Sequence, residues 1–355
     1  MCCRAGVQDW LGRADGSRSR DNLLDLLAAA SVKVLLRSAL RRAGTEVDWL
    51  RSRRDAADIA VFHEFHAPPY GGGNQFLLAL VGLLRTRGVS VEVNRVSGRT
   101  PACLYNSFNF DFARLQRFAR TGVRMVHRVD GPIGVYRGFD DGTDRRIEAI
   151  NLQLADATIF QSRYSLDKHR ELGLDLRHPV VIPNAVDPTI FYPPTAREPL
   201  DGRRLRVIAT SWSDNPRKGA AVLSWLDRRL DFDSFELTFA GRTEEDFRSI
   251  RVVDALPSRP LAALLRGQDA YLAPSLDDPC SNALLEALAC GLPAAFRRSG
   301  GHPELVGDGG LGFDDVEELP RVLAQLRDEL EQRRAAIRLP SLADVATRYL
   351  EVLRG

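Results

Sequence analysis

Two carboxylates in the second half of the chain stand where a ligand could meet them. Asp278 follows a predicted strand at 270–273, and Glu286 is the one residue in the run ALLEALAC at 283–290 that is not apolar. This run predicts a helix buried on most sides, where a carboxylate is costly unless a hydrogen bond stabilises it. Because open α/β sheets bind ligands at the carboxyl ends of their strands, a ligand hydroxyl is one candidate partner.

Structural roles for the same carboxylates stay open at this stage. Asp278 or Ser281 could cap the start of the helix, which ends at Cys290 and Gly291. Glu286 could pair with a buried arginine instead of a ligand. The residue types alone do not decide between these interpretations.

A lysine supplies the opposite charge. Lys218 stands directly before a helix predicted over 220–230. A cation at that end opposes the helix dipole, so it is a poor structural choice and a good ligand for an anion such as a phosphate. A solvated surface lysine is the alternative, and we favour the anion ligand.

A glycine-rich loop in the first half could also approach a phosphate. The sequence GGGN at 71–74 lies between a predicted strand at 58–63 and a predicted helix at 75–87. Glycines at such a place let backbone N–H groups and the helix N-terminus approach an anion. The pattern is not a dinucleotide fingerprint, because its third glycine would fall on Phe76. His63, Glu64 and His66 lack the spacing of a zinc-binding helix, so we expect no metal there.

Strands and helices alternate along both halves of the chain, which predicts an α/β fold. Prolines at 188, 193, 194 and 199 mark a linker between the halves. The segment LYNSFNFDF at 104–112 is rich in aromatic residues and asparagine, and we expect it to be irregular. Its aromatic residues could stack on a sugar or fill the core, and we favour the core. Long helices are predicted at 316–335 and 342–353.

Composition limits the classes of partner. The 355 residues carry a net charge of only +2, which does not suggest a nucleic-acid partner. The five cysteines lack metal-ligand spacing, so a reducing, cytoplasmic setting is the simplest interpretation. No apolar run reaches the roughly 20 residues of a membrane span. A basic amphipathic helix predicted at 22–43 could pack on the first half, which we favour, or contact a membrane surface peripherally.

The order of these motifs resembles the donor-site signature of family-4 glycosyltransferases. The chain carries an acid, seven residues, Glu286, then ALACGLP at 287–293 and GGHPE at 300–304. The sequence NAVD at 184–187 is similar to the Asn-Gly-Val-Asp that closes the first domain in that family. Asp278 stands where the family usually has Glu.

The resemblance implies the GT-B fold, in which two Rossmann-like domains face each other across a cleft. On this basis an N-terminal, partly helical extension occupies 1–50, and an acceptor domain occupies 51–187. A nucleotide-sugar donor domain occupies 200–338, and a C-terminal helix at 341–355 returns to the first domain.

The resemblance also implies roles in donor binding. Glu286 would hold the ribose, and Asp278 and the loop after it would face the donor sugar. Lys218 would contact the diphosphate, with Arg217 as a substitute for an arginine that the family carries earlier. The implied donor-binding residues are Gly72, Gly73, Arg217, Lys218, Asp278, Ser281, Asn282 and Glu286.

A polar residue of the first half is implied beside the reacting carbon. Family members carry a histidine there, at the end of the strand predicted at 123–127. Asp130 aligns with that place and is our first choice, and His127 is the second. The implied catalytic residues are therefore Asp130 and Lys218.

The implied reaction moves a sugar from a nucleotide-sugar co-substrate to a hydroxyl acceptor with retention of configuration. Similar enzymes need no divalent metal or other cofactor. The acceptor could be a glycan, a lipid-linked glycan or a small natural product. A nucleotide-sugar epimerase or phosphorylase on the same architecture, or a non-catalytic nucleotide-sugar-binding protein, are the alternatives.

Overall fold

The structure is a computed structural model of the chain, and it describes residues 56–67, 71–107, 110–119, 122–213 and 215–355. The predicted extension at 1–50, with its amphipathic helix and with Cys2 and Cys3, lies outside the described residues. Cys103, Cys280 and Cys290 are described as buried free thiols. In the described part of the chain, no helix is both long and apolar enough to cross a membrane.

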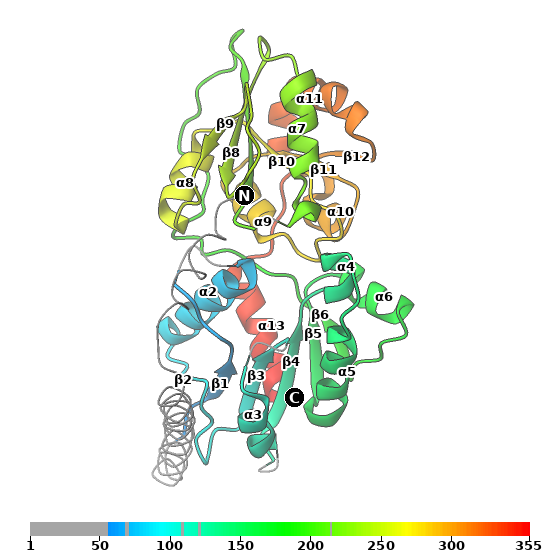
Figure 1. Cartoon of the computed structure of the whole chain (residues 1–355). Helices are drawn as coiled ribbons and strands as arrows, with labels where there is room; N and C mark the ends of the chain where they lie inside the picture. Colours follow the sequence, from blue (N-terminus) through cyan, green and yellow to red (C-terminus); the bar gives the residue numbers. More distant parts are fainter. Residues whose placement is uncertain (1–55, 68–70, 108–109, 120–121, 214) are drawn as a thin grey trace, which may run out of the picture. The chain divides into compact units, whose positions relative to one another are not determined.

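The first half of the described chain is a parallel sheet covered by helices (Figure 1). Its strand order is β2-β1-β3-β4-β5-β6. The strands are β1 (Ile59–Phe62), β2 (Val91–Val93), β3 (Ala102–Asn106), β4 (Arg124–Val129), β5 (Ala157–Phe160) and β6 (Pro179–Val181). The helices are α2 (Gly72–Thr86), α3 (Phe112–Ala119), α4 (Ile133–Arg137), α5 (Thr143–Leu154) and α6 (Arg163–Glu171). Strand order changes direction between β1 and β3, and such a switch point is where parallel sheets bind ligands.

Strand β3 corrects the expectation of an irregular segment at 104–112. Its five residues are buried and pair in parallel with β1 on one side and β4 on the other. A central strand is buried on both faces, so it shows no alternation of apolar and polar residues. Because Ala102–Asn106 contains a tyrosine and an asparagine, the sequence did not predict this strand.

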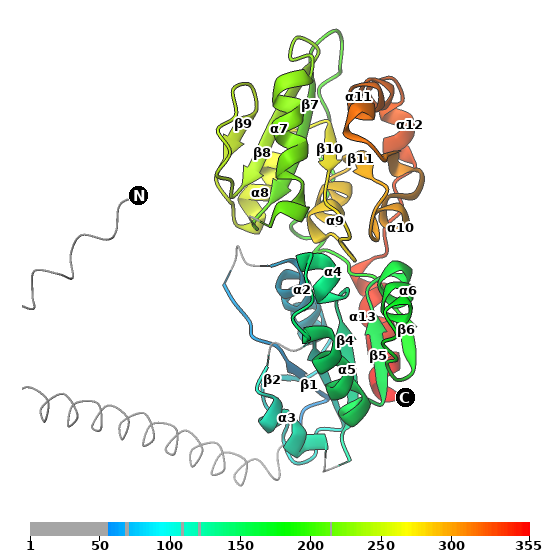
Figure 2. The ribbon, with the colours of Figure 1, turned by 45° about the vertical axis from the view of Figure 1, so that its right-hand side comes forward.

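The second half repeats the plan with the strand order β12-β11-β10-β7-β8-β9, again all parallel (Figure 2). Its strands are β7 (Leu205–Ser211), β8 (Phe235–Gly241), β9 (Arg251–Val253), β10 (Ala270–Ala273), β11 (Ala294–Arg297) and β12 (Gly310–Phe313). Its helices are α7 (Ala220–Arg229), α8 (Ser258–Arg266), α9 (Asn282–Ala289), α10 (His302–Val306), α11 (Leu319–Asp328) and α12 (Leu330–Ala335). Short 3-10 turns occupy η2 (Pro216–Lys218), η3 (Gly307–Gly309) and η4 (Val316–Glu318). The switch point of this sheet lies between β7 and β10.

The helix predicted at 316–335 is divided in the structure. It begins as the turn η4, continues as α11 and resumes as α12 after Glu329. Leu319, Leu323, Leu326 and Leu330 are buried at helical spacing through the break. The apolar period therefore predicted one helix, although the backbone at Glu329 departs from helical angles.

The last helix, α13 (Leu342–Arg354), belongs to the core of the first sheet. Tyr349 is fully buried, and its ring lies 5.7 Å from that of Phe76 on α2. Arg124 at the start of β4 donates a hydrogen bond of 2.8 Å to the Val352 carbonyl. Figure 1 shows this helix, in red, beside the strands of the first half.

Candidate functional site

An ion pair joins the loops that follow β7 and β10. Lys218 ends the turn η2, and its Nζ donates to Asp278 Oδ2 at 2.7 Å. Burial would lower the pKa of Lys218, but the Asp278 carboxylate and the Tyr136 side chain together outweigh burial and raise the pKa above its ordinary value. Burial would likewise raise the pKa of Asp278, and Lys218 keeps it below its usual range. Both groups are therefore charged at neutral pH.

The turn before α7 brings this cation to the site. Asn215 caps η2 by accepting the backbone N–H of Arg217, and Gly219 adopts a left-handed φ of 94°. A Cβ at Gly219 would lie 2.6 Å from the Pro274 side chain, so only glycine fits there. The Lys218 ammonium also lies 5.1 Å from the centre of the Tyr136 ring, which comes from α4 of the first half.

Glu286 is a buried carboxyl group of the site without a partner among the described residues. It lies on α9 with 9% of its surface exposed, and no described residue donates a hydrogen bond or an ion pair to its carboxylate. Burial raises its pKa to about 8. An ionised carboxylate held like this is costly, so burial favours the protonated form unless a partner donates hydrogen bonds to it.

The neighbouring acid and cation pair with each other. Arg217 forms an ion pair with Asp277, and the Tyr164 hydroxyl donates to the same carboxylate at 2.8 Å. Asp277 has a left-handed φ of 52°, which places it on a sharp turn after β10. Arg217 is thus directed to Asp277 in this structure.

The start of α9 meets the start of α2. Ser281 caps α9 by accepting the Leu284 N–H, whereas Asp278 does not cap it. A Cβ at Gly72 would lie 2.3 Å from Asn282 Nδ2, so a glycine is needed for this approach. A Cβ at Gly73 would lie 3.9 Å from Asp130 Oδ1. The structure therefore brings the predicted glycines close to Asn282 and Asp130.

A buried arginine fixes Asp130 at the end of β4. Arg128 is fully buried and donates to Asn106 Oδ1 at 2.5 Å, to Asn184 Oδ1 at 2.8 Å and to Asp130 Oδ1 at 3.1 Å. The Ser107 hydroxyl donates to Asp130 Oδ2 at 2.9 Å, and the Gln161 amide donates to the other carboxylate oxygen. The Asp130 side chain is 35% exposed, so it remains accessible to a ligand.

The structure does not support His127, the second choice for the polar residue beside the reacting carbon. Its side chain has no exposed surface, and Nε2 contacts the Ser107 carbonyl at 2.8 Å while Nδ1 contacts the Asn151 amide at 3.0 Å. Its ring stacks on Tyr105 with centroids 4.3 Å apart. Burial lowers the pKa of His127 to about 4, so it is a neutral core residue.

Several hydrogen bonds connect helices and loops of the first half with those of the second half. The Glu304 carboxylate, on α10, accepts the backbone N–H groups of Arg163 at 2.8 Å and Tyr164 at 2.7 Å, which begin α6. The Asn184 amide donates to Asn282 Oδ1 at 3.2 Å. Asn184 also bonds Arg128 and Gln161, so it links the Asp130 network to the start of α9.

Comparison with known proteins gives the family. The model described as Glycosyltransferase Family 4 matches residues 32–190, and the model described as Glycosyl transferases group 1 matches residues 220–329. The chain belongs to these glycosyltransferases of the GT-B architecture. The resemblance of the donor-site motifs and the expected fold of two Rossmann-like units are both confirmed.

The similar proteins are distant. An MMP alpha-(1->4)-mannosyltransferase of Mycolicibacterium hassiacum is 32% identical over 199 residues, so the chain matches about half of that relative's length (47%) and 48% of its own. Sucrose-phosphate synthase from Thermosynechococcus elongatus superposes with a TM-score of 0.66 at 16% identity, covering 85% of this chain and 98% of that one. The Anabaena protein HepE in complex with UDP-glucose gives a TM-score of 0.63 at 15% identity, covering 83% and 99%.

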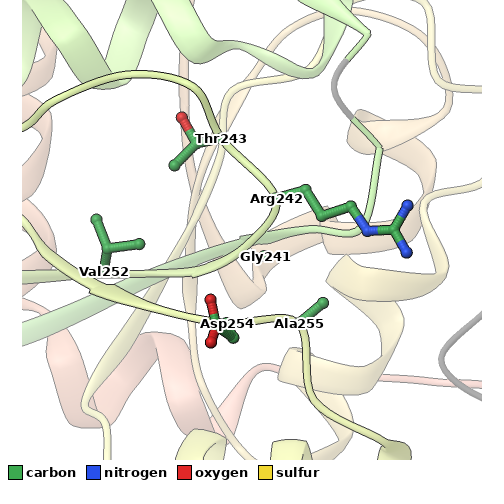
Figure 3. A pocket seen from close by; sticks show the side chains of 6 residues that line it. All are labelled: Gly241, Arg242, Thr243, Val252, Asp254 and Ala255. Carbon is green, nitrogen blue, oxygen red and sulfur yellow. The ribbon is translucent and has the colours of Figure 1, made fainter.

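A pocket of the second half lies away from the residues singled out in the sequence. It has a volume of about 430 Å³ and is lined by Gly241, Arg242, Thr243, Val252, Asp254 and Ala255 (Figure 3). These residues lie at and directly after the carboxyl ends of β8 and β9, and β8 neighbours β7 on the side away from β10.

Sequence reasoning missed the residues that hold Asp130. The strand predicted at 123–127 ended before Arg128, whereas β4 contains this residue, and a buried arginine requires several acceptors. Asn184 had been noted only as part of the NAVD motif. Gln161 and Asn106 carried no signal, because their partners are distant in the sequence.

Proposed function

We propose that this protein transfers a hexosyl group from a nucleotide-sugar to a hydroxyl acceptor with retention of configuration. The family supports the reaction class, and the matched relative is a mannosyltransferase. The structural neighbour HepE binds UDP-glucose, which supports a nucleotide-sugar as the donor. The proposal includes no metal or other cofactor.

The observation that carries the proposal is the unpaired carboxylate of Glu286. A ribose offers two adjacent hydroxyl donors, which suit a carboxylate that no described protein group satisfies. Binding a ribose would replace the cost of burial with two charge-assisted hydrogen bonds. These bonds favour the ionised form, so donor binding at neutral pH should release a proton from Glu286.

Charge stabilisation of the leaving diphosphate falls to the groups around α2 and η2. Lys218 forms an ion pair with Asp278, and its ammonium group has further N–H donors that a phosphate could accept. Gly72 and Gly73 open α2, so their backbone N–H groups and the helix dipole favour an anion. Developing negative charge on the diphosphate would be stabilised by fixed donors of this kind.

Asp130 is the proposed polar group beside the anomeric carbon. Its carboxylate is held by Arg128, Ser107 and Gln161, and its partial exposure leaves it open to a substrate. A fixed carboxylate there would stabilise positive charge on the sugar as the bond to the diphosphate breaks. The acceptor hydroxyl would attack from the face that the diphosphate leaves. The acceptor class stays open among glycans, lipid-linked glycans and small natural products.

Calorimetric titration with a panel of nucleotide-sugars tests the proposal. We expect one class of donor to bind, and Glu286→Gln to weaken it about tenfold or more, because glutamine loses the charge and one acceptor. Glu317→Gln, an exposed carboxylate on η4, is the matched control and should leave binding unchanged. Equal donor affinity in Glu286→Gln and the native chain would contradict the role of Glu286.

Product analysis separates the proposal from its alternatives. Transfer to an acceptor panel, with the anomeric configuration determined by NMR, should show a retained glycoside. A changed sugar formed from the donor alone would indicate an epimerase. Tight donor binding with no turnover on any acceptor would favour a binding protein.

A further inference from the structure

The pocket after β8 and β9 combines a carboxylate, a guanidinium and an apolar wall. In Figure 3 the Thr243 and Val252 side chains lie on one side, Arg242 extends toward the other, and Asp254 lies beside Ala255. Its volume of about 430 Å³ falls within the range of small-ligand pockets. A Cβ at Gly241 would lie 1.7 Å from the Ser211 carbonyl oxygen, so this wall of the pocket carries no side chain.

The position of the pocket along the sheet suits the base of a nucleotide. Adjacent strands are about 4.8 Å apart, and β8 is two strands from β10 in the order β10-β7-β8-β9. The pocket is therefore displaced by about 10 Å from the loop that carries Asp278, on the far side of the Lys218 loop. A ribose and its phosphates span such a separation, with the base in the pocket and the diphosphate at Lys218.

The two charged side chains of the pocket are open to a ligand. Within the described part of the chain, neither the Asp254 carboxylate nor the Arg242 guanidinium has a hydrogen bond or an ion pair, and both residues are exposed. A carboxylate accepts hydrogen bonds and cannot donate them, whereas a guanidinium only donates. A base that satisfies both must present N–H donors on one edge and acceptors on another.

Guanine meets this requirement best among the common bases. Its N1–H and N2–H groups lie side by side and match the two oxygens of a carboxylate, and its O6 and N7 match an arginine in two parallel hydrogen bonds. Uracil offers one N–H between two carbonyl groups, which would face the carboxylate unfavourably. Adenine has no carbonyl for the arginine and only one amino group for the acid.

We propose that Asp254 and Arg242 select guanine, so that the donor is a guanosine diphosphate sugar. This inference rests on the proposed function, because it assumes that the pocket receives the nucleotide end of the donor. Asp254 determines the choice of base, since it rejects bases that present carbonyl groups. Val252 and Gly241 offer apolar contact for the ring.

Titration of the full chain with GDP, UDP and ADP at one salt concentration tests this inference. GDP should bind at least about tenfold more tightly than UDP or ADP, since one good bidentate contact discriminates by roughly 10- to 100-fold. IDP, which lacks the N2 amino group, should bind more weakly than GDP. Asp254→Asn should reduce the GDP-to-UDP affinity ratio by about tenfold, and Asp246→Asn, an exposed acid on the preceding loop, should leave it unchanged.

The ratio of affinities is measured on one protein sample, so a partly unfolded variant does not distort it. UDP or ADP binding more tightly than GDP would overturn the inference and leave the proposed function intact. An unchanged ratio in Asp254→Asn would overturn the role of that carboxylate. If none of the three diphosphates bound, both the inference and the proposed function would fail.

Discussion

The two sheets hold their buried charges in opposite ways. At the end of β4, Arg128 is buried among three acceptors, and Asp130 accepts hydrogen bonds from several side chains. On α9, Glu286 is nearly as buried, yet no described group pairs with it. The first half thus carries a charge network in which both Arg128 guanidinium NH2 groups and the Asp130 carboxylate have protein partners. The second half carries a buried carboxyl group with which no described residue pairs.

This difference separates a scaffold from a binding site. A satisfied buried network gives rigidity, because every member restrains the others. An unsatisfied buried group lowers stability and is retained where it gains a partner on binding. We therefore expect substitutions of Arg128 and of its acceptors Asn106 and Asn184 to act mainly on folding. Substitutions around Glu286 should act mainly on ligand binding.

The largest effect on stability should come from Arg128→Met. Loss of the guanidinium removes the donor to the Asn106 and Asn184 side-chain oxygens and one of the donors to Asp130, and breaking a buried charge network costs about 3–5 kcal/mol. Urea denaturation should show this fall in the free energy of unfolding. Arg298→Met, which removes an exposed pair with Asp314, should cost about 1 kcal/mol or less. A loss of only about 1 kcal/mol for Arg128→Met would contradict the stabilising role of the Arg128 network.

Lys218→Ala should have the largest effect on turnover. Removal of one donor to a developing negative charge lowers kcat by about 100- to 1,000-fold. The single variant also leaves Asp278 buried without its partner, so Lys218→Ala with Asp278→Asn should recover stability but not turnover. Lys168→Ala, at a more exposed lysine on α6, is the matched control. Steady-state rates with unchanged transfer would show that Lys218 has only a structural role.

The pH dependence of stability should reveal the cost of Glu286. Burial raises its pKa from 4.5 to about 8, so the folded state keeps a proton that the unfolded state has lost. Stability from this group is therefore greatest below pH 4.5, falls as the pH rises toward 8, and then stays level. Glu286→Gln removes this loss, and at pH 8.5 it should be more stable than the native chain by about 2 kcal/mol. Unfolding curves at pH 5 and 8.5 with the same difference at both would contradict the unpaired carboxylate.

The smallest effect should follow Glu304→Gln. The carboxylate accepts two backbone N–H groups at the start of α6, and the amide retains only one acceptor atom. Loss of a charged cap costs about 1 kcal/mol. Thermal unfolding should show a modest decrease, whereas Glu351→Gln on the exposed face of α13 should show none.

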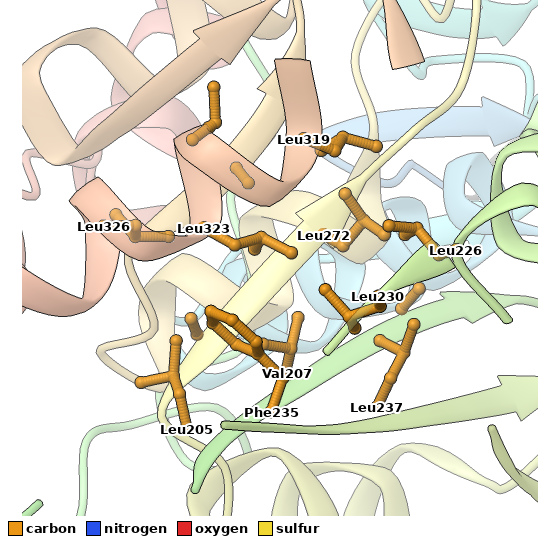
Figure 4. Packing of buried hydrophobic residues seen from close by; sticks show 14 of the residues in the cluster. Leu205, Val207, Leu226, Leu230, Phe235, Leu237, Leu272, Leu319, Leu323 and Leu326 are labelled. Atoms are coloured by element: carbon orange, nitrogen blue, oxygen red, sulfur yellow. The ribbon is translucent and has the colours of Figure 1, made fainter. Parts of the chain in front are cut away.

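The sequence predicted the features that depend on residues close together in the chain, namely most strands and helices and the order of the family's motifs. Apolar runs and breaks at glycine and proline predicted β10, α9 and most strands of the second half. The cluster of Leu205, Leu272 and Leu323 in Figure 4 follows from such runs. The motif order around Glu286 predicted the family, which the comparisons confirm.

The remaining features depend on contacts that sequence spacing does not contain. Lys218 and Asp278 are 60 residues apart, and their ion pair arises because β7 and β10 are neighbours. The exclusion of His127 required the burial given by the strands on both sides of β4. The assignment of β3 failed because a central strand with tyrosine and asparagine lacks a clear apolar pattern.

The return of α13 to the first sheet affects how the chain is made. Leu342, Val345 and Tyr349 complete the core that contains Ile59 and Phe76. During synthesis, the core of the first half therefore stays incomplete until the ribosome has added α13, which follows the whole second sheet. The second half can fold on emergence, while the first exposes an incomplete apolar surface until that late helix arrives. Aggregation of nascent chains should accordingly begin at the earlier half.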